Sequence, residues 1–213
     1  MSDSLLRVPM LKDEIALSTL ISSSPAPITQ LSSLWNGLPI DNTLKTTLWA
    51  AWTPSFLYLL FECSYVSLNI SATPQFKEKT MGLWDRDVVE AFVAPDSRNP
   101  CHYREVEVSP LGEWVDVELE ITNGERKSNW EWNSSVESVC KIEDSVWKTA
   151  FRIPSETLFG HNISAGQECV GNFYRCDGTE PDRHYITWQP TMTPEPAFHV
   201  PERFGRIRFV DPT

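Results

Sequence analysis

The sequence lacks the features that mark a membrane span or the common catalytic folds. Its longest run of aromatic and aliphatic residues, 56–61, is far shorter than the roughly 20 residues that a membrane-spanning helix needs. It contains no GxSxG, HExxH, P-loop or GxGxxG motif, and its four histidines stand far apart without metal-ligand spacing. The sequence therefore gives no support to the enzyme classes that these motifs identify.

Basic residues are also scarce. Lys and Arg total 18 against 29 Asp and Glu, so the formal net charge is −11. Such a chain repels phosphate backbones and anionic lipids, which argues against a nucleic-acid or membrane partner. The five cysteines are odd in number and form no CxxC, so we expect reduced, mostly buried thiols. Without the long apolar stretch of a signal peptide, the sequence predicts a cytoplasmic protein, or a secreted one if the chain is a processed or partial piece.

What the sequence does have is tryptophan, nine residues in 213. The length and the hydrophobic fraction of 41% fit one globular domain. We expect residues 1–30 to be an N-terminal extension packing on the domain of residues 31–213. Leu11, Ile15 and Leu17 could share a short helix, which the SSSPAP segment at 22–27 would end.

Alternation of apolar and polar residues predicts strands along the rest of the chain. The predicted strands are 46–52, 56–63, 87–94, 103–109, 114–121, 147–153, 169–176, 184–188 and 205–210. Ser109, Pro110 and Gly112 follow the order of a type I turn and predict a hairpin. Together these patterns predict an all-β fold, an antiparallel β-sandwich of jelly-roll or immunoglobulin type with a short N-terminal helical or irregular segment.

Within this pattern, residues 114–121 predict a half-buried strand with Asp116, Glu118 and Glu120 on a water-facing side. Glu90 is unusual, because it shares a strand face with apolar side chains. A carboxylate there must lie in a cleft or pair with a cation, and Arg86 is one candidate partner. Arg104 and Arg175 are the other two candidates.

Five segments in order carry a resemblance to a known family. They are GLWDRDVVEAFVAP (82–95), YREVEVSPLGEWVD (103–116), W-x-x-x-F-R-I-P (147–154), GNFYRCDG (171–178), and TWQPT (187–191) with FHVPERFG (198–205). Over about residues 45–210 the chain resembles the family 9 carbohydrate-binding module. The resemblance implies a β-sandwich that binds mono-, oligo- or polysaccharide without cleaving it.

The resemblance also implies particular site residues. Two tryptophans that clamp a sugar ring fall on Trp84 and Trp188, and an acidic ligand of the hydroxyls falls on Glu90. Arg104, Asn172 and Arg175 lie in matching segments as further hydrogen-bonding residues. No cofactor is required, and calcium stays open with no ligands assigned. An indole covers the C–H face of a sugar, while Glu and Arg bond pairs of hydroxyls.

Two other functions stay open at this stage. The first is a sugar-active enzyme using Asp85, Asp87 and Glu90, although Asp87 and Glu90, three residues apart on one strand, should face opposite sides. The second is a structural or interaction sandwich without a sugar site. Trp84 and Trp188 facing each other across an open gap would favour sugar binding.

Overall fold

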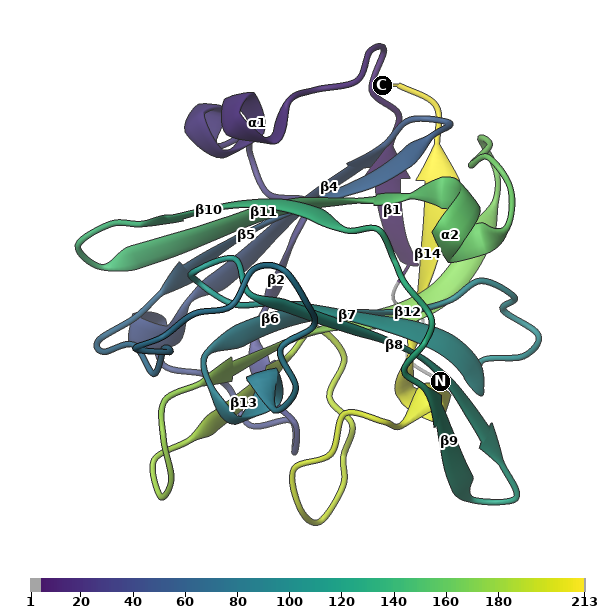
Figure 1. Cartoon of the computed structure of the whole chain (residues 1–213). Coiled ribbons are helices and arrows are strands. Elements are labelled where there is room, and N and C mark those ends of the chain that lie inside the picture. The colour runs from purple at the N-terminus through teal and green to yellow at the C-terminus, as the bar shows by residue number, and fades with distance from the viewer. Residues whose placement is uncertain (1–4, 213) are drawn as a thin grey trace.

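Two β-sheets stacked face to face form the protein, as the computed structural model of residues 5–212 shows (Figure 1). Within this range the large sheet has nine strands, in the order β1 (Leu5–Pro9), β14 (Gly205–Val210), β12 (Glu168–Asp177), β6 (Val88–Ala94), β7 (His102–Val108), β8 (Trp114–Thr122) and β9 (Glu125–Asn129), while β13 (His184–Thr187) pairs with β12 and β3 (Ser33–Leu34). The small sheet has the order β10 (Glu137–Ile142), β11 (Val146–Pro154), β5 (Phe56–Ser64), β4 (Thr46–Trp52) and β2 (Thr29–Leu31). The predicted all-β sandwich is confirmed, and its named strands pair antiparallel except β1 with β14.

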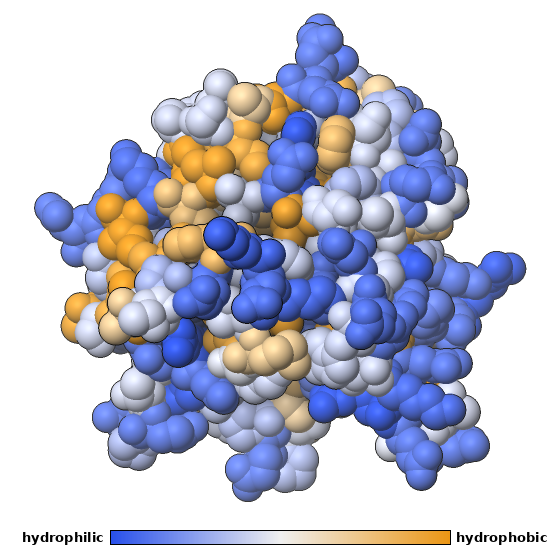
Figure 2. Space-filling view, in the orientation of Figure 1, coloured by the Kyte–Doolittle hydropathy of each residue, from blue (hydrophilic) through white to orange (hydrophobic). Residues whose placement is uncertain are grey.

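Helices are short and lie at the periphery. The α-helices are α1 (Leu17–Ser23) and α2 (Ser155–Phe159), and 3₁₀ turns span Asn42–Leu44, Leu83–Asp85 and Pro201–Arg203. Neither α-helix of the described range has the length and apolar character that crossing a membrane requires. In Figure 2, hydrophilic residues cover most of the visible face, and the apolar ones gather mainly at its upper left.

The predicted strands all correspond to strands of the structure, but several others were missed. These are β1, β2, β3, β9 and β10. Strand β9 has the sequence ERKSN and is exposed throughout, so no apolar alternation marks it. Strand β1 pairs in parallel with β14, and β2 crosses the boundary predicted at residue 30, so the N-terminal segment supplies strands to both sheets.

The predicted N-terminal helix begins later than expected. Leu11 and Ile15 precede α1, which starts at Leu17 and buries Leu17, Leu20 and Ile21 against the outer face of the small sheet. That spacing of three and four residues is one face of a helix, whereas Leu11 and Ile15 only pack at the edge of the same cluster.

Aromatic side chains fill the space between the sheets. Phe61 stacks on Phe151 with ring centroids 5.9 Å apart, and Trp52 and Trp147 are buried. Trp52 also donates its indole N–H to the Val210 carbonyl at 3.1 Å. These strand tryptophans are core residues.

The hairpin of β7 and β8 has the predicted turn, with the Gly112 N–H donating to the Ser109 carbonyl at 3.0 Å. The water-facing acidic side predicted for β8 needs correction. Glu120 is exposed, but Asp116 is fully buried and pairs with Lys79 at 2.5 Å. The long loop after β5 brings that lysine over the strand, and an alternation pattern cannot show such cover.

A second apolar cluster covers the outer face of the large sheet, the face turned away from the small sheet. Val88 and Phe92 of β6, Tyr103 of β7 and Tyr174 of β12 belong to it. Because side chains alternate along a strand, Glu90 shares this outer face with Val88 and Phe92. A sheet covered on both faces explains why β6 is buried along its whole length.

Trp188 directly follows β13 and packs on the inner side of the large sheet. Its ring centroid lies 5.7 Å from that of Phe173, which belongs to the core between the sheets. A Cβ added to Gly205 would come within 2.5 Å of the Trp188 ring, so the glycine makes room for the indole. A Cβ at Gly171, in the neighbouring strand, would instead overlap the backbone carbonyl of Phe92.

We expect Gly205→Ala to lower the free energy of unfolding by about 1–3 kcal/mol, because the methyl group overlaps the Trp188 ring. In a Trp188→Ala background the loss should fall by about half or more. Gly171→Ala is the matched control, because its clash is with backbone and should persist in that background. Urea unfolding of the single and double variants measures these differences. Equal losses for Gly205→Ala in both backgrounds would contradict the packing described.

Candidate functional site

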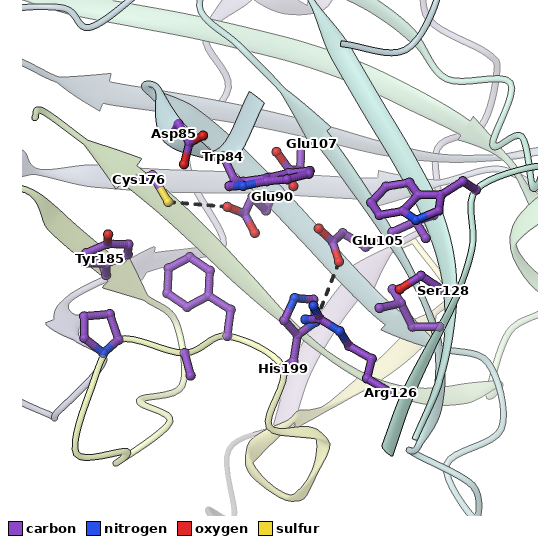
Figure 3. Close-up of a pocket in the computed structure, with 16 residues that line it drawn as sticks. Trp84, Asp85, Glu90, Glu105, Glu107, Arg126, Ser128, Cys176, Tyr185 and His199 are labelled. Carbon is purple, nitrogen blue, oxygen red and sulfur yellow. Dashed lines mark hydrogen bonds and ion pairs between the residues drawn. The ribbon is translucent and has the colours of Figure 1, made fainter. Parts of the chain in front are cut away.

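A pocket of about 400 Å³ opens on the outer face of the large sheet (Figure 3). Strands β6, β7, β8, β9, β12 and β13 line it, together with the turn at Leu83–Asp85, Trp130 and the segment 196–199. Figure 3 shows Glu90, Glu105 and Glu107 in its interior, with Trp84 on one side and His199 on the other. Its volume falls in the range of small-molecule sites, about 300–1,000 Å³.

Strand pairing brings the three glutamates of the pocket together. Glu90 of β6 lies directly opposite Glu107 of β7 in the register of the two strands. Glu105 is two residues before Glu107 and therefore points to the same face. One carboxylate oxygen from each of the three side chains lies within 4.8 Å of the others. We call these three residues the glutamate cluster.

The glutamate cluster is buried, at 2%, 6% and 1% exposure for Glu90, Glu105 and Glu107. Burial raises the pKa of Glu90 well above its usual value, and the charge of Glu105 adds to the shift. Burial likewise raises the pKa of Glu107, with the charges of Glu90 and Glu105 adding to it. The pKa of Glu105 is raised by burial too. The pocket thus concentrates carboxyl groups whose charged form is disfavoured by burial.

The groups beside the glutamate cluster do little to neutralise it. Cys176 donates its thiol hydrogen to Glu90 Oε1 at 3.5 Å, and that thiol has a pKa raised well above its usual value by burial. His199 Nδ1 lies 3.8 Å from Glu105 Oε2, but burial lowers the pKa of this imidazole to about 3, so it is neutral at pH 7. Arg126 also lines the pocket, and its side chain is exposed. The pocket consequently favours hydroxyl donors or cations and disfavours anions.

Two tryptophans form one side of the pocket mouth. Trp84, in the 3₁₀ turn, and Trp130, just after β9, have ring centroids 6.1 Å apart and an interplanar angle of 32°. Each is 38% exposed. A ring held between two indoles would need about 7–8 Å, twice the van der Waals contact distance. Trp84 and Trp130 are therefore too close to clamp a sugar ring between them, and we call the two partly exposed rings the aromatic wall.

A half-buried ammonium, that of Lys79, holds the Trp130 half of this wall. Lys79 Nζ donates to the Trp130 carbonyl at 2.7 Å and to the carbonyl of Trp132. The same ammonium pairs with Asp116 Oδ1 at 2.5 Å, which ties the segment after β9 to β8. Trp130 thus stands on a backbone that is fixed by charge-assisted hydrogen bonds.

A guanidinium holds the Trp84 half in the same way. Arg183 donates to the carbonyls of Trp84 at 2.5 Å, Asp85 at 3.1 Å and Arg86 at 2.9 Å. It also donates to the Gly178 carbonyl at 2.7 Å. The planar fork of an arginine suits several acceptors at once. The turn that carries Trp84 is therefore fastened to the loop after β12.

The structure brings together two of the six residues predicted for the site. Trp84 and Glu90 line the pocket, but Trp188 packs on the opposite side of the large sheet. Asn172 is fully buried, and its amide nitrogen donates to the Tyr174 hydroxyl at 2.9 Å. Trp84 and Trp188 therefore do not face each other across a gap.

The two predicted arginines also lie away from the pocket. Arg104 donates to Glu118 at 3.2 Å, on the inner side of β7. Arg175 is fully buried, donates to Thr46 Oγ1 at 2.9 Å in the small sheet, and pairs with Asp177. Both neighbour outward-facing residues in sequence, so strand alternation turns their side chains inward.

The predicted cation partner of Glu90 is likewise absent from residues 5–212. Arg86 lies 3.8 Å from Glu113 Oε1. Arg104 pairs with Glu118, and Arg175 pairs with Asp177. Asp87 is tied to the loops, accepting from the Gly178 N–H at 2.7 Å and the Asn69 N–H at 3.1 Å. As expected, it does not face Glu90, so the two do not form a pair of catalytic carboxylates.

Sequence reasoning missed several residues of the pocket. Glu105 and Glu107 could have been found from the sequence. They alternate with Val106 and Val108 in the predicted strand 103–109, which the predicted hairpin pairs with strand 114–121. Other pocket residues, such as Trp130, Cys176 and Phe198, lie at distant positions in the chain. No local pattern relates them to one another.

Solved structures with the same fold include proteins of two organisms. A protein of Bacteroides uniformis that is proposed to bind carbohydrate has a TM-score of 0.75 at 20% identity, over 98% of this chain and 100% of its own. A family 9 carbohydrate-binding module of Caldicellulosiruptor kristjanssonii, in complex with cellotriose, has a TM-score of 0.66 at 12% identity, over 99% and 95% of the two chains. Its complex with glucose has a TM-score of 0.64 at 13% identity, over 99% and 97%.

A search of curated proteins gives no match to this chain. The model of carbohydrate-binding family 9 matches residues 64–209, which include the turn of Trp84, the glutamate cluster and the segment 196–199. Because this match spans well over half of the sequence, the chain belongs to carbohydrate-binding family 9.

Proposed function

We propose that the chain binds carbohydrate in the pocket beside the glutamate cluster, with a sugar ring stacked on the wall of Trp84 and Trp130. The observation that carries this proposal is an aromatic wall, 38% exposed at each ring, next to buried carboxylate oxygens that face the same pocket. A pyranose has apolar C–H faces and a rim of hydroxyls. An indole binds such a face, and a carboxylate accepts from vicinal hydroxyls.

Family membership supports binding rather than catalysis. The related module of Caldicellulosiruptor kristjanssonii has been solved with cellotriose and with glucose, so these sugars are the first ligands to test. The pocket volume of about 400 Å³ suits one or two sugar rings better than a long stretch of polymer. Three carboxylates in the pocket select for hydroxyl-rich neutral ligands over phosphorylated or carboxylated ones.

Replacing the aromatic wall tests the proposal directly. Trp84→Ala and Trp130→Ala should each weaken binding of glucose or cellotriose by roughly tenfold or more, since each removes stacking area. Isothermal titration calorimetry and tryptophan fluorescence measure the affinity. Trp49→Phe, beneath α1 on the far sheet, is a control that should bind as the unmodified protein does.

Trp188→Phe separates this proposal from the clamp that the sequence suggested. The aromatic wall requires no contact with Trp188, so the variant should keep its sugar affinity within about twofold. A clamp of Trp84 and Trp188 would require a large loss. If no sugar binds at millimolar concentration, or if Trp84→Ala and Trp130→Ala bind unchanged, the proposal fails.

Arg183 should act as a positioning residue for Trp84. Arg183→Gln removes most of the donors that hold the turn and should weaken sugar binding by roughly three- to tenfold. In a Trp84→Ala background the same change should have little effect on the residual affinity, because the ring it positions is gone. Arg206→Gln, which removes an exposed pair with Glu168, is the control. NMR titration of the single and double variants measures the coupling, and strictly additive losses would contradict this role.

A further inference from the structure

The glutamate cluster differs from other buried acids of the described chain in having no strong partner. Asp116 pairs with Lys79, Asp177 pairs with Arg175, and Asp87 accepts two backbone N–H groups. For Glu90, Glu105 and Glu107, by contrast, no lysine or arginine nitrogen of residues 5–212 lies within 4.0 Å. Three carboxyl groups from two adjacent strands thus share one buried space.

Two oxygens of the cluster are left without a hydrogen bond. Glu105 Oε2 and Glu107 Oε2 are buried and have no hydrogen-bond partner among the described residues. His199 Nδ1 stands 3.8 Å from Glu105 Oε2, too far for a hydrogen bond, and lies 2.9 Å from the Tyr103 hydroxyl. A buried carboxylate oxygen without a partner is costly, so these atoms point to a ligand that binds in the pocket.

We propose that Glu90, Glu105 and Glu107 bind a divalent cation of the calcium class in the sugar pocket. Calcium takes six to eight oxygen ligands in irregular geometry, and three carboxylates from one sheet face leave its other positions open toward the pocket. Magnesium demands a near-ideal octahedron. Zinc prefers nitrogen and sulfur ligands, whereas the three cluster residues offer only oxygen. The neighbouring His199 Nδ1 is already within hydrogen-bond distance of the Tyr103 hydroxyl, and burial raises the pKa of the Cys176 thiol, which disfavours the thiolate that zinc binds. A double positive charge also compensates three carboxylates better than a single ammonium group does.

The position of the cluster inside the pocket gives the cation a second role, which rests on the proposed function. Vicinal hydroxyls of a sugar stacked on Trp84 and Trp130 would complete the coordination of the ion. The protein would then recognise its sugar through a metal bridge as well as through the aromatic wall. Sugar affinity should therefore depend on the ion.

Metal binding can be measured without any sugar. The full chain is treated with EDTA, dialysed, and titrated with Ca²⁺ by calorimetry and with Tb³⁺ by luminescence excited through tryptophan. We expect one site whose Ca²⁺ affinity falls at least about tenfold in Glu105→Gln/Glu107→Gln. The control Glu120→Gln/Glu125→Gln removes the same charge from exposed positions on β8 and β9 and should bind Ca²⁺ as the unmodified protein does.

The cluster variant also has a folding control. Glutamine has the shape of glutamic acid and carries no charge to bury, so the melting temperature of this variant in EDTA should be unchanged or higher, and a loss of metal binding cannot be attributed to unfolding. Trp84→Phe/Trp130→Phe should lower the Tb³⁺ luminescence while leaving the calorimetric Ca²⁺ affinity intact, which would locate the ion beside the aromatic wall. Unchanged Ca²⁺ affinity in Glu105→Gln/Glu107→Gln, or no Ca²⁺ binding at millimolar concentration, overturns the proposal.

Sugar titrations with Ca²⁺ and with EDTA then test the bridge. We expect cellotriose affinity to fall at least about fivefold in EDTA. Equal affinities would overturn the bridge while leaving the metal site intact, and sugar binding without any Ca²⁺ binding would overturn the metal site while leaving the proposed function intact. Binding of glucosamine, but of no divalent ion, that is lost in Glu105→Gln/Glu107→Gln would assign the cluster to an amine instead and overturn the metal site.

Discussion

The pairing of β6 with β7 is the constraint on which the rest of the pocket depends. It sets Glu90 opposite Glu107 and, through the two-residue period of a strand, adds Glu105 to the same face. Slipping this register by one residue would carry these carboxylates into the core between the sheets, among Val89, Ala91 and their neighbours. The apolar residues that alternate with the glutamates therefore fix the position of the acidic groups more firmly than any contact among the acids does.

The aromatic wall depends on a different kind of interaction. Trp84 and Trp130 come from loops about 45 residues apart in sequence, and regular pairing within a sheet places neither ring. Two cations do so instead, because Lys79 and Arg183 each bond backbone carbonyls of the segment that carries a tryptophan. A binding surface of side chains on loops can then be as well ordered as one built on strands, without the entropy cost of ordering it when a ligand arrives.

The same two kinds of interaction explain how much the sequence could predict. Alternation and turn chemistry are local signals in the sequence. They are enough to predict the sandwich, the β7–β8 hairpin and the burial of Trp52 and Trp147. The resemblance to the family predicted that Trp84, Glu90 and Trp188 share one site. In the structure Trp84 and Glu90 line the pocket, whereas Trp188 does not. A matching segment does not say to which side of the sheet a side chain turns, and Trp188 turns inward over Gly205.

The acidic groups at the surface and those in the pocket differ in how far water solvates them. At −11 overall, most acidic groups are solvated at the surface, where water screens them and where they cost little. The glutamate cluster has no such screening, since its members are at most 6% exposed. Its charge must be met by protons, by hydroxyl donors or by a cation, and the occupant that meets it best gains the most affinity. A buried group of carboxyls therefore limits the chemistry of the ligand more strictly than the aromatic wall does, because an indole accepts the apolar face of almost any sugar.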